Sequence, residues 1–215
     1  IKGLMYGDDP KQGVVEGRNF THPDLGLAFQ APNGFFMING TRAVAISGQS
    51  GKGEFTGGSY DGNLETYVRS AFAGLSQQGQ PAITPQAIER TTVNGIPAAY
   101  GTARVQSGSG QVDVVVFAYE FAKDKAFHFM TVAQAGQASV FSPMFSSMRR
   151  ISGNEASAIK ARRIDVVTVK SGDTLQSLAA RMAYSDAALE RFLVLNGLTA
   201  SSRLSAGDKV KIGTY

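Results

Sequence analysis

Two histidines, His22 and His128, are the residues whose chemistry would decide whether this 215-residue chain carries a metal or an acid–base centre. His22 precedes a proline and His128 lies between two phenylalanines, so neither belongs to the close histidine pairs that bind catalytic zinc. We interpret His128 as a strand residue that faces solvent or is hydrogen-bonded near a sheet. Asp8 and Asp9 precede a proline without a third ligand nearby, which favours a turn with solvated carboxylates. The sequence therefore predicts no metal and no cofactor.

Other reactive motifs lack the structural context that their chemistry needs. Ser109 lies in a Gly-Ser-Gly turn and not at the strand-to-helix elbow of a serine hydrolase. Gly48, Gly51 and Gly53 have the look of a phosphate loop, but no helix headed by Lys-Ser or Lys-Thr follows them directly. A flexible hairpin or edge loop over 49–62 is favoured instead. We assign no catalytic residue and expect no enzyme activity, although spacing alone does not exclude a carboxylate pair, and an unrecognised hydrolase stays a third alternative.

The net charge of +4 is concentrated at one place in the chain. Residues 1–148 hold ten basic and eleven acidic side chains, and residues 164–215 hold six and five. The segment 149–163 holds five basic side chains and one acidic one. It is too short and too poor in aromatic residues to predict a nucleic-acid surface, so a solvated linker is favoured over contact with an acidic polymer or lipid headgroups. The basic residues of this segment are Arg149, Arg150, Lys160, Arg162 and Arg163.

Composition bounds the class of protein further. With no cysteine, the chain has neither disulfides nor thiol chemistry, although this does not fix the compartment. No apolar run approaches twenty residues, which predicts no membrane span, and no signal-peptide pattern opens the chain. Because the chain begins Ile-Lys-Gly-Leu, we expect a fragment of a longer protein. Its length and 43% hydrophobic residues suit two modest domains.

The region 20–152 shows the patterns of an α+β domain. The first twenty residues carry no sustained periodicity, whereas the run 112–121 has the strongest strand pattern in the chain. The order of elements predicts an antiparallel sheet covered by helices on one side. The expected elements are strands at 27–31, 35–38 and 43–47, a helix from 64 that Asn63 caps and that ends near Gly79-Gln80-Pro81, two strands around an Asn94-Gly95 turn, strands at 112–121 and 126–133, and a closing helix at 139–148.

The last fifty or so residues predict a smaller β-α-α-β unit. Alternation at 166–169 predicts a strand, and Ser171-Gly172 predicts a turn in front of a helix capped by Asp173 or Thr174. Ser185 or Asp186 is the expected cap of a second helix, which the pair Asn196-Gly197 ends. A final strand is expected at 209–212.

This unit resembles the LysM module. The resemblance rests on Val-Lys-Ser-Gly-Asp-Thr-Leu at 169–175, Leu-Asn-Gly-Leu at 195–198 and Leu-x-x-Gly-Asp-x-Val-x-Ile at 204–212. It implies a non-catalytic domain that binds peptidoglycan or chitin-like N-acetylglucosamine polymers in a groove between the first turn and the loop after the second helix. The glycan-binding residues that it implies are Gly172, Asp173, Thr174, Leu175, Asn196, Gly197, Leu198, Thr199 and Leu204.

The second helix departs from the family pattern. Four consecutive apolar residues, 192–195, stand where the family usually has a more polar approach to its asparagine. A free helix of this size should show one apolar face only. This motivates an alternative in which the module has lost sugar binding and packs these residues against the larger domain, as a structural or protein-interaction platform.

Two further resemblances concern the rest of the chain. Ala-Pro-x-Gly-Phe at 31–35 and Phe-x-x-Met-x-x-Ser-Met-Arg at 141–149, together with the element order, are similar to the PsbP-like fold, which implies a binding or assembly module. The segment 6–26 resembles the region that follows the catalytic domain in bacterial cell-envelope zinc metalloproteases related to the CAAX prenyl protease. That resemblance implies a periplasmic or cell-envelope location and a His-Glu-x-x-His helix upstream, but no catalytic residue in this chain.

The sequence therefore predicts a two-domain, non-catalytic region. Its C-terminal module would bind glycan, and its α+β domain would contact a substrate, a protein partner or a protease domain. The expected organisation is an approach segment at 1–19, an α+β PsbP-like domain at 20–152, a basic linker at 153–163 and a LysM-like domain at 164–215.

Overall fold

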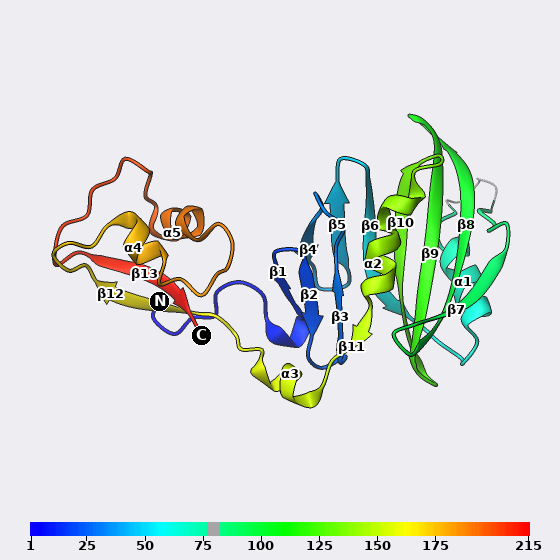
Figure 1. Ribbon diagram of the computed structural model, residues 1–215, viewed down its shortest axis with the longest axis horizontal. Coiled ribbons are helices and arrows are strands. Elements are labelled where there is room, and N and C mark those ends of the chain that lie inside the picture. Colours follow the sequence, from blue (N-terminus) through cyan, green and yellow to red (C-terminus); the bar gives the residue numbers. More distant parts are fainter. Residues whose placement is uncertain (77–81) are drawn as a thin grey trace.

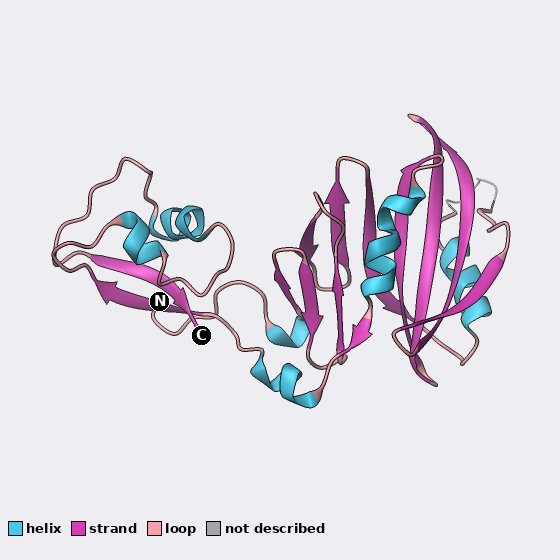
Figure 2. Cartoon of the chain, viewed as in Figure 1, coloured by secondary structure: helices cyan, strands magenta, loops and turns pink. Residues whose placement is uncertain are grey.

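The computed structural model describes residues 1–76 and 82–215 of the chain. Strands dominate the larger part of the molecule, and a small module with two short helices forms the C-terminal part (Figures 1 and 2). The strands form one seven-stranded, one four-stranded and one two-stranded sheet. This is the predicted α+β class with antiparallel pairing.

A seven-stranded antiparallel sheet forms the centre of the larger part, in the order β4-β5-β6-β10-β9-β8-β7. The two long strands β9 and β10 lie side by side near its middle, where the sequence pattern predicted them. Their bounds and those of the other strands are β4 Phe36–Asn39, β5 Val44–Gly48, β6 Gly51–Gly58, β7 Ile88–Val93, β8 Ile96–Ser107, β9 Gly110–Ala122 and β10 Lys125–Gln134.

Alternation along β9 builds two separate cores. Val114, Val116 and Ala118 face the helix α1 (Leu64–Ala73), whose Asn63 accepts a hydrogen bond from the Thr66 N–H at 3.1 Å as the expected cap. Odd-numbered residues of β9 face the other way, into a core shared with the 3₁₀ turn η2 (Ala138–Phe141) and the helix α2 (Ser142–Ser147). Helices therefore cover both faces of the sheet and not one.

A four-stranded sheet covers the second core beside α2. It has the order β1-β2-β3-β11, and Phe20 and Phe29 from it pack against Phe55 of the larger sheet. The strand β1 lies inside the predicted approach segment 1–19, which therefore contributes to the fold. The bounds are η1 Pro10–Gln12, β1 Val14–Glu16, β2 Asn19–His22, β3 Leu27–Gln30 and β11 Arg149–Arg150.

Glycines explain why the sequence analysis missed β6, one of the strands that it did not predict. The stretch predicted as a loop over 49–62 contains β6, which pairs with both β5 and β10 and is not an edge. A Cβ on Gly51 or Gly53 would lie 2.7 or 2.8 Å from a carbonyl oxygen of β10, and one on Gly57 would lie 2.9 Å from the Phe127 ring. Close packing against β10 excludes side chains at these positions, so the strand lacks the β-branched residues that would reveal it.

One tight turn and one tyrosine hold the helix α2 against the larger sheet. Asn94 and Gly95 both have positive φ, 48° and 79°, as the predicted hairpin turn requires. The Asn94 amide also donates to the Met148 carbonyl oxygen at 2.8 Å, and the Tyr119 hydroxyl donates to the Phe145 carbonyl oxygen at 2.7 Å, so the C-terminal half of α2 is held on the sheet. The turn expected at Gly79-Gln80-Pro81 lies outside the described residues.

The C-terminal module has the predicted β-α-α-β order. A two-stranded antiparallel ribbon of β12 and β13 carries two short helices over a core that contains Leu178 and Phe192, both fully buried. A further helix, α3 (Gly153–Ala158), lies within the predicted linker. The bounds of the module's elements are β12 Arg163–Thr168, α4 Leu175–Ala179, α5 Ala188–Asn196 and β13 Lys209–Thr214.

The first residues of the chain extend this ribbon. Hydrogen bonds run from the Gly3 N–H to the Ile164 carbonyl oxygen and from the Ile164 N–H to the Leu4 carbonyl oxygen, at 2.7 and 2.8 Å. The Tyr6 N–H donates to the Arg162 carbonyl oxygen at 2.8 Å. The N-terminal segment thus covers the outer edge of β12, so the chain's two ends meet in one module (Figure 1).

Arg162 joins the module to the larger part. Its guanidinium carbon lies 4.1 Å from the Tyr184 ring centre and 5.4 Å from that of Tyr215, and its Nη2 donates to Glu16 Oε1 of β1 at 2.8 Å. Its Nε also donates to the Ala183 carbonyl oxygen. With only 6% of its surface exposed, Arg162 is not part of a solvated junction, and this part of the linker prediction is wrong.

Replacing Arg162 should loosen the junction. In Arg162→Met, Glu16 loses its partner and both tyrosine rings lose the cation, so the free energy of unfolding should fall by about 2 kcal/mol in urea denaturation followed by circular dichroism. Arg203→Met, which alters an exposed arginine of the module, is the matched control. Equal stability of the two variants would contradict the role given to Arg162.

His128 is half-buried and contacts Tyr67 of α1. Its Nδ1 lies 2.8 Å from the Tyr67 hydroxyl oxygen, and this hydroxyl donates to the Ala126 carbonyl oxygen at 3.2 Å. Burial lowers the pKa of His128 to about 4 and raises the pKa of Tyr67 to about 12. His128 is therefore neutral at pH 7 and hydrogen-bonded near the sheet.

The His128 pKa predicts acid sensitivity. The unfolded chain binds a proton on this side chain near pH 6.5 and the folded chain only near pH 4, so stability is lost as the pH falls through that window. Between pH 7 and pH 5 the free energy of unfolding should fall by about 2 kcal/mol more in the wild type than in His128→Gln, measured by urea denaturation. Parallel pH profiles for the two proteins would show that His128 is not responsible.

Candidate functional site

The turn between β12 and α4 is held by its own polar side chains. Asp173 Oδ2 accepts from the Lys170 N–H at 2.7 Å, and Thr174 Oγ1 accepts from the Ser177 N–H at 3.0 Å. Ser177 Oγ in return accepts from the Thr174 N–H at 2.8 Å, which completes a capping box. Of the two caps that the sequence offered, Thr174 is the one used. Asp173 and Thr174 therefore fix the backbone of this turn, while Gly172 is exposed with open space where a side chain would be.

Asn196 ties the second helix to the last strand. Its Nδ2 donates to the carbonyl oxygens of Phe192 and Lys211, both at 2.9 Å, and its Oδ1 accepts from the Lys211 N–H at 2.7 Å. The nitrogen and the oxygen of the Asn196 side-chain amide are thus both engaged with the module's own backbone. Asn196 positions the loop that follows it, a role different from direct contact with a sugar.

The loop after α5 begins at a left-handed glycine. Gly197 has φ 64°, and the Leu198 N–H returns to the Leu193 carbonyl oxygen at 2.8 Å, as in a Schellman motif. Beyond it, the Thr199 N–H donates to Ser202 Oγ at 2.9 Å. Thr199 itself is exposed and Leu198 half-buried, so the loop presents polar groups above an apolar base.

The structure brings the two predicted segments onto one apolar base. Leu175 from the first turn and Leu198 and Leu204 from the second loop belong to the same hydrophobic cluster. Both loops lie at one end of the module, away from the chain termini in Figure 1. Asp208, which the sequence analysis did not single out, holds the end of the second loop by accepting from the Ser205 N–H at 2.8 Å.

This arrangement is suited to binding and not to reaction. The carboxylates at 173 and 208 are engaged with backbone N–H groups, which leaves the loops to offer hydroxyls, backbone groups and leucine side chains. Over residues 1–76 and 82–215, no group of three or more His, Cys, Asp or Glu side chains is arranged to hold a metal ion.

The apolar run of α5 is accounted for within the module. Phe192 is fully buried in the module's core, and Leu193 and Leu195 pack against that core from its edge. Val194 is 81% exposed. The alternative in which these residues pack against the larger domain is therefore wrong, although the exposed valine remains unusual.

The start of α5 also differs from expectation. Neither Ser185 nor Asp186 caps this helix; the N-cap is Ala187, with a positive φ of 47° and no side-chain hydrogen bond. Asp186 instead accepts from Arg191 Nη2 at 3.1 Å, and the Arg191 guanidinium carbon lies 4.4 Å from the Tyr184 ring centre. The salt bridge between Asp186 and Arg191 takes the place of the expected side-chain cap. The spacing of residues in the sequence did not reveal this pair.

The β-α-α-β unit with these two loops is a small, separate module, and comparison with known families assigns it to a class. Residues 167–213 match the family model of the LysM domain. This segment is therefore a LysM domain, a class of non-catalytic binding domain. No curated protein matches the chain.

Two solved structures are similar to the chain. A protein from Bacteroides thetaiotaomicron has a TM-score of 0.46 and 9% identity, over 73% of this chain and 55% of that one, so the chain spans about half of its length. The solution structure of cyanobacterial PsbP (CyanoP) from Synechocystis has a TM-score of 0.47 and 14% identity, over 67% of this chain and 98% of that one. The resemblance of residues 20–152 to the PsbP-like fold stays a prediction.

None of the helices described is long and apolar enough to cross a membrane.

The hydrogen bonds of Asn196 predict a structural cost. Asn196→Ala leaves the Lys211 backbone groups without partners, so the free energy of unfolding should fall by about 1 to 3 kcal/mol, and the Lys211 amide should exchange faster with solvent. Hydrogen exchange followed by NMR measures both. The control is Thr199→Ala on the same loop, whose hydroxyl is exposed and should change stability little. An unchanged Lys211 exchange rate in Asn196→Ala would refute the positioning role.

Proposed function

We propose that this chain is a non-catalytic, glycan-binding region of a bacterial cell-envelope protein. Its LysM domain binds peptidoglycan-type N-acetylglucosamine strands through the turn at 172–175 and the loop at 196–204. The observation that carries the proposal is the LysM match at 167–213 together with two loops whose backbones are fixed by their own side chains.

Affinity for one short glycan should be modest. The loops offer a shallow apolar base, so little area is buried, and each sugar hydroxyl exchanges a hydrogen bond to water for one to the protein. The prearranged loops reduce the ordering cost, because Asp173, Thr174 and Asn196 hold them before any ligand arrives. Several LysM domains along one strand would gain by avidity.

The α+β domain serves, in this proposal, to contact a substrate or a protein partner. The Arg162 junction supports a coupling between the two parts, since it joins the module directly to β1 through Glu16. The same junction supports the alternative function, a protein-interaction platform whose LysM domain has lost sugar binding. Glycan titration separates the two.

The parent protein would be a cell-envelope zinc metalloprotease related to the CAAX prenyl protease, with a periplasmic location. What supports this is the resemblance of the segment 6–26, and a glycan-binding domain suits an envelope protein. Sequencing the reading frame upstream of Ile1 tests it. A His-Glu-x-x-His motif there would support the parentage, and its absence would count against it.

Chitin oligosaccharides and muropeptides, titrated into the full chain to millimolar concentration, should shift the amide resonances of 172–175 and 196–204. Thr199→Arg, which places a bulky charged side chain in the exposed loop, should weaken binding about tenfold. Ser185→Arg, at the other end of α5, is the matched control and should bind as the wild type does. If the amide resonances of neither loop shift with either ligand, the proposed glycan binding is wrong and the protein-interaction platform is favoured.

A further inference from the structure

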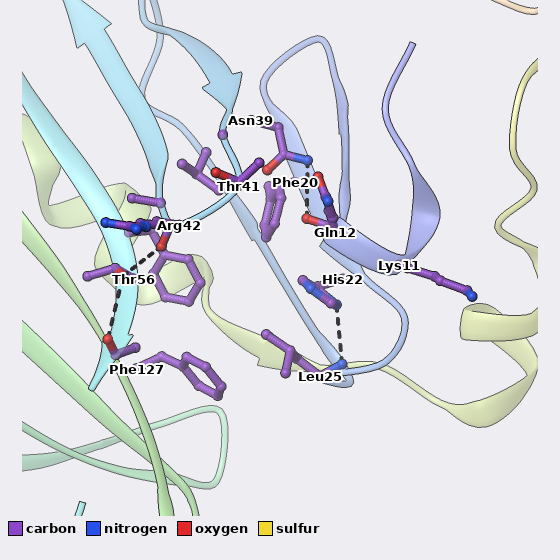
Figure 3. A pocket seen from close by; sticks show the side chains of 15 residues that line it. Lys11, Gln12, Phe20, His22, Leu25, Asn39, Thr41, Arg42, Thr56 and Phe127 are labelled. Atoms are coloured by element: carbon purple, nitrogen blue, oxygen red, sulfur yellow. Dashed lines mark hydrogen bonds between the residues drawn. The ribbon is translucent and has the colours of Figure 1, made fainter. Parts of the chain in front are cut away.

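A cleft in the larger part lies far along the chain from the LysM loops. It opens between the two sheets, where the ends of β2, β4 and β6 meet, and has a volume of about 250 Å³ (Figure 3). The four-stranded sheet forms one wall and the seven-stranded sheet the other. This is the open end of a two-sheet sandwich, a place where proteins commonly accommodate small ligands.

The base of the cleft is aromatic. Phe20 and Phe55 line it and are 1% and 4% exposed, with ring centres 6.2 Å apart. Phe127, half-buried, lines it from β10, 6.0 Å from the Phe55 ring. The volume is close to that of a single aromatic side chain with its backbone atoms. The cleft thus suits one apolar group.

The walls offer a neutral hydrogen-bond donor. His22 Nδ1 accepts from the Leu25 N–H at 3.3 Å, so the proton of the neutral ring is on Nε2. Burial lowers the pKa of His22, an effect that the nearby Asp24 partly offsets. At neutral pH His22 is therefore a donor without charge.

The only charged residues that line the cleft are Lys11 and Arg42. Both side chains are exposed, and neither has an ion-pair partner within the described ranges. Thr56 Oγ1 donates to the Arg42 carbonyl oxygen at 2.9 Å, which fixes the backbone of the turn that carries this arginine. In Figure 3 the side chains of Lys11 and Arg42 both extend away from the middle of the cleft, on opposite sides of it, so both contribute positive potential at its mouth.

We propose that this cleft binds an apolar group that carries a carboxylate. The aromatic base would hold the apolar group, the His22 Nε2–H would donate to the carboxylate, and the positive potential of Arg42 and Lys11 would favour its negative charge. Two sources have this chemistry: a free aromatic acid, and the C-terminal residue of a polypeptide. The inference is independent of the glycan function, because it concerns other residues and another class of ligand.

NMR titration of the full chain tests the proposal. The probes are N-acetylphenylalanine, its neutral amide, and two short peptides that end in phenylalanine with a free or an amidated C-terminus. The free acids should shift resonances of Phe20, Phe55 and Thr56, and the amides should bind at least tenfold more weakly. Binding by the peptide acid identifies a chain terminus as the ligand, and binding by the small acid alone identifies a free acid.

Substitution then tests the role of the positive charge. Arg42→Gln should weaken binding of the free acid about tenfold, because the positive potential at the mouth of the cleft falls, and should leave the weak binding of the amide unchanged. Arg69→Gln on α1, on the opposite face of the sheet, is the matched control. Equal binding of acid and amide, an Arg42→Gln variant that binds as the control does, or the absence of any shift in the cleft would each overturn the proposal.

Discussion

One buried arginine determines how the two parts of this protein are connected. Arg162 has aromatic rings on its guanidinium and a carboxylate and a carbonyl oxygen on its N–H groups, so a cation that is almost fully covered has its hydrogen bonds satisfied. Lysine would not substitute for it, because only the planar guanidinium can stack on rings and donate sideways at once. Glu16 lies near the start of the chain and Tyr215 at its end, so this one side chain connects segments that no single helix or strand connects.

The larger part depends on a different constraint, the alternation of side chains along β9. One face of this strand carries small residues that let α1 approach, and the other carries the aromatic rings Phe117, Tyr119 and Phe121. The ring of Phe117 stacks on Phe145 at 4.8 Å, which places α2 over the sheet. The glycines of β6 belong to the same packing, since they let that strand lie close beside β10. Small residues on one face of the sheet and aromatic residues on the other thus alternate along β9. The cleft lined by Phe20 and Phe55 lies where this packing ends.

Much of this could be predicted from the sequence. Strand alternation, the Asn63 cap, the Asn94-Gly95 turn and the β-α-α-β order are local signals, and each corresponds to a feature of the structure. The missed features are those that tertiary contacts determine. The glycine-rich β6 has no strand propensity of its own. Asp186 forms a salt bridge with Arg191 and does not cap the helix. The helix α2 lies on the face opposite α1 because the four-stranded sheet packs on that face.

The candidate site shows the same division. The sequence motif places the two loops, but it does not say that Asp173, Thr174 and Asn196 direct their polar groups at the module's own backbone. The cleft of the larger part has no sequence signal at all, because η1, β2, β4 and β6 contribute to it from separate stretches. The division of the chain at 20, 152 and 164 stays a prediction.

The N-terminal edge of the ribbon has a consequence for the order of folding. The Arg163 side chain donates to the Gly3 carbonyl oxygen across 160 residues of chain, so this strand pairing closes a very long loop. The entropic cost of closure grows only slowly with length, but the rate of forming such distant contacts is low. During synthesis, residues 3–6 must wait, unpaired, until their partners Arg162 and Ile164 leave the ribosome. The larger domain, completed earlier, shortens that search by bringing the two ends toward each other before they meet.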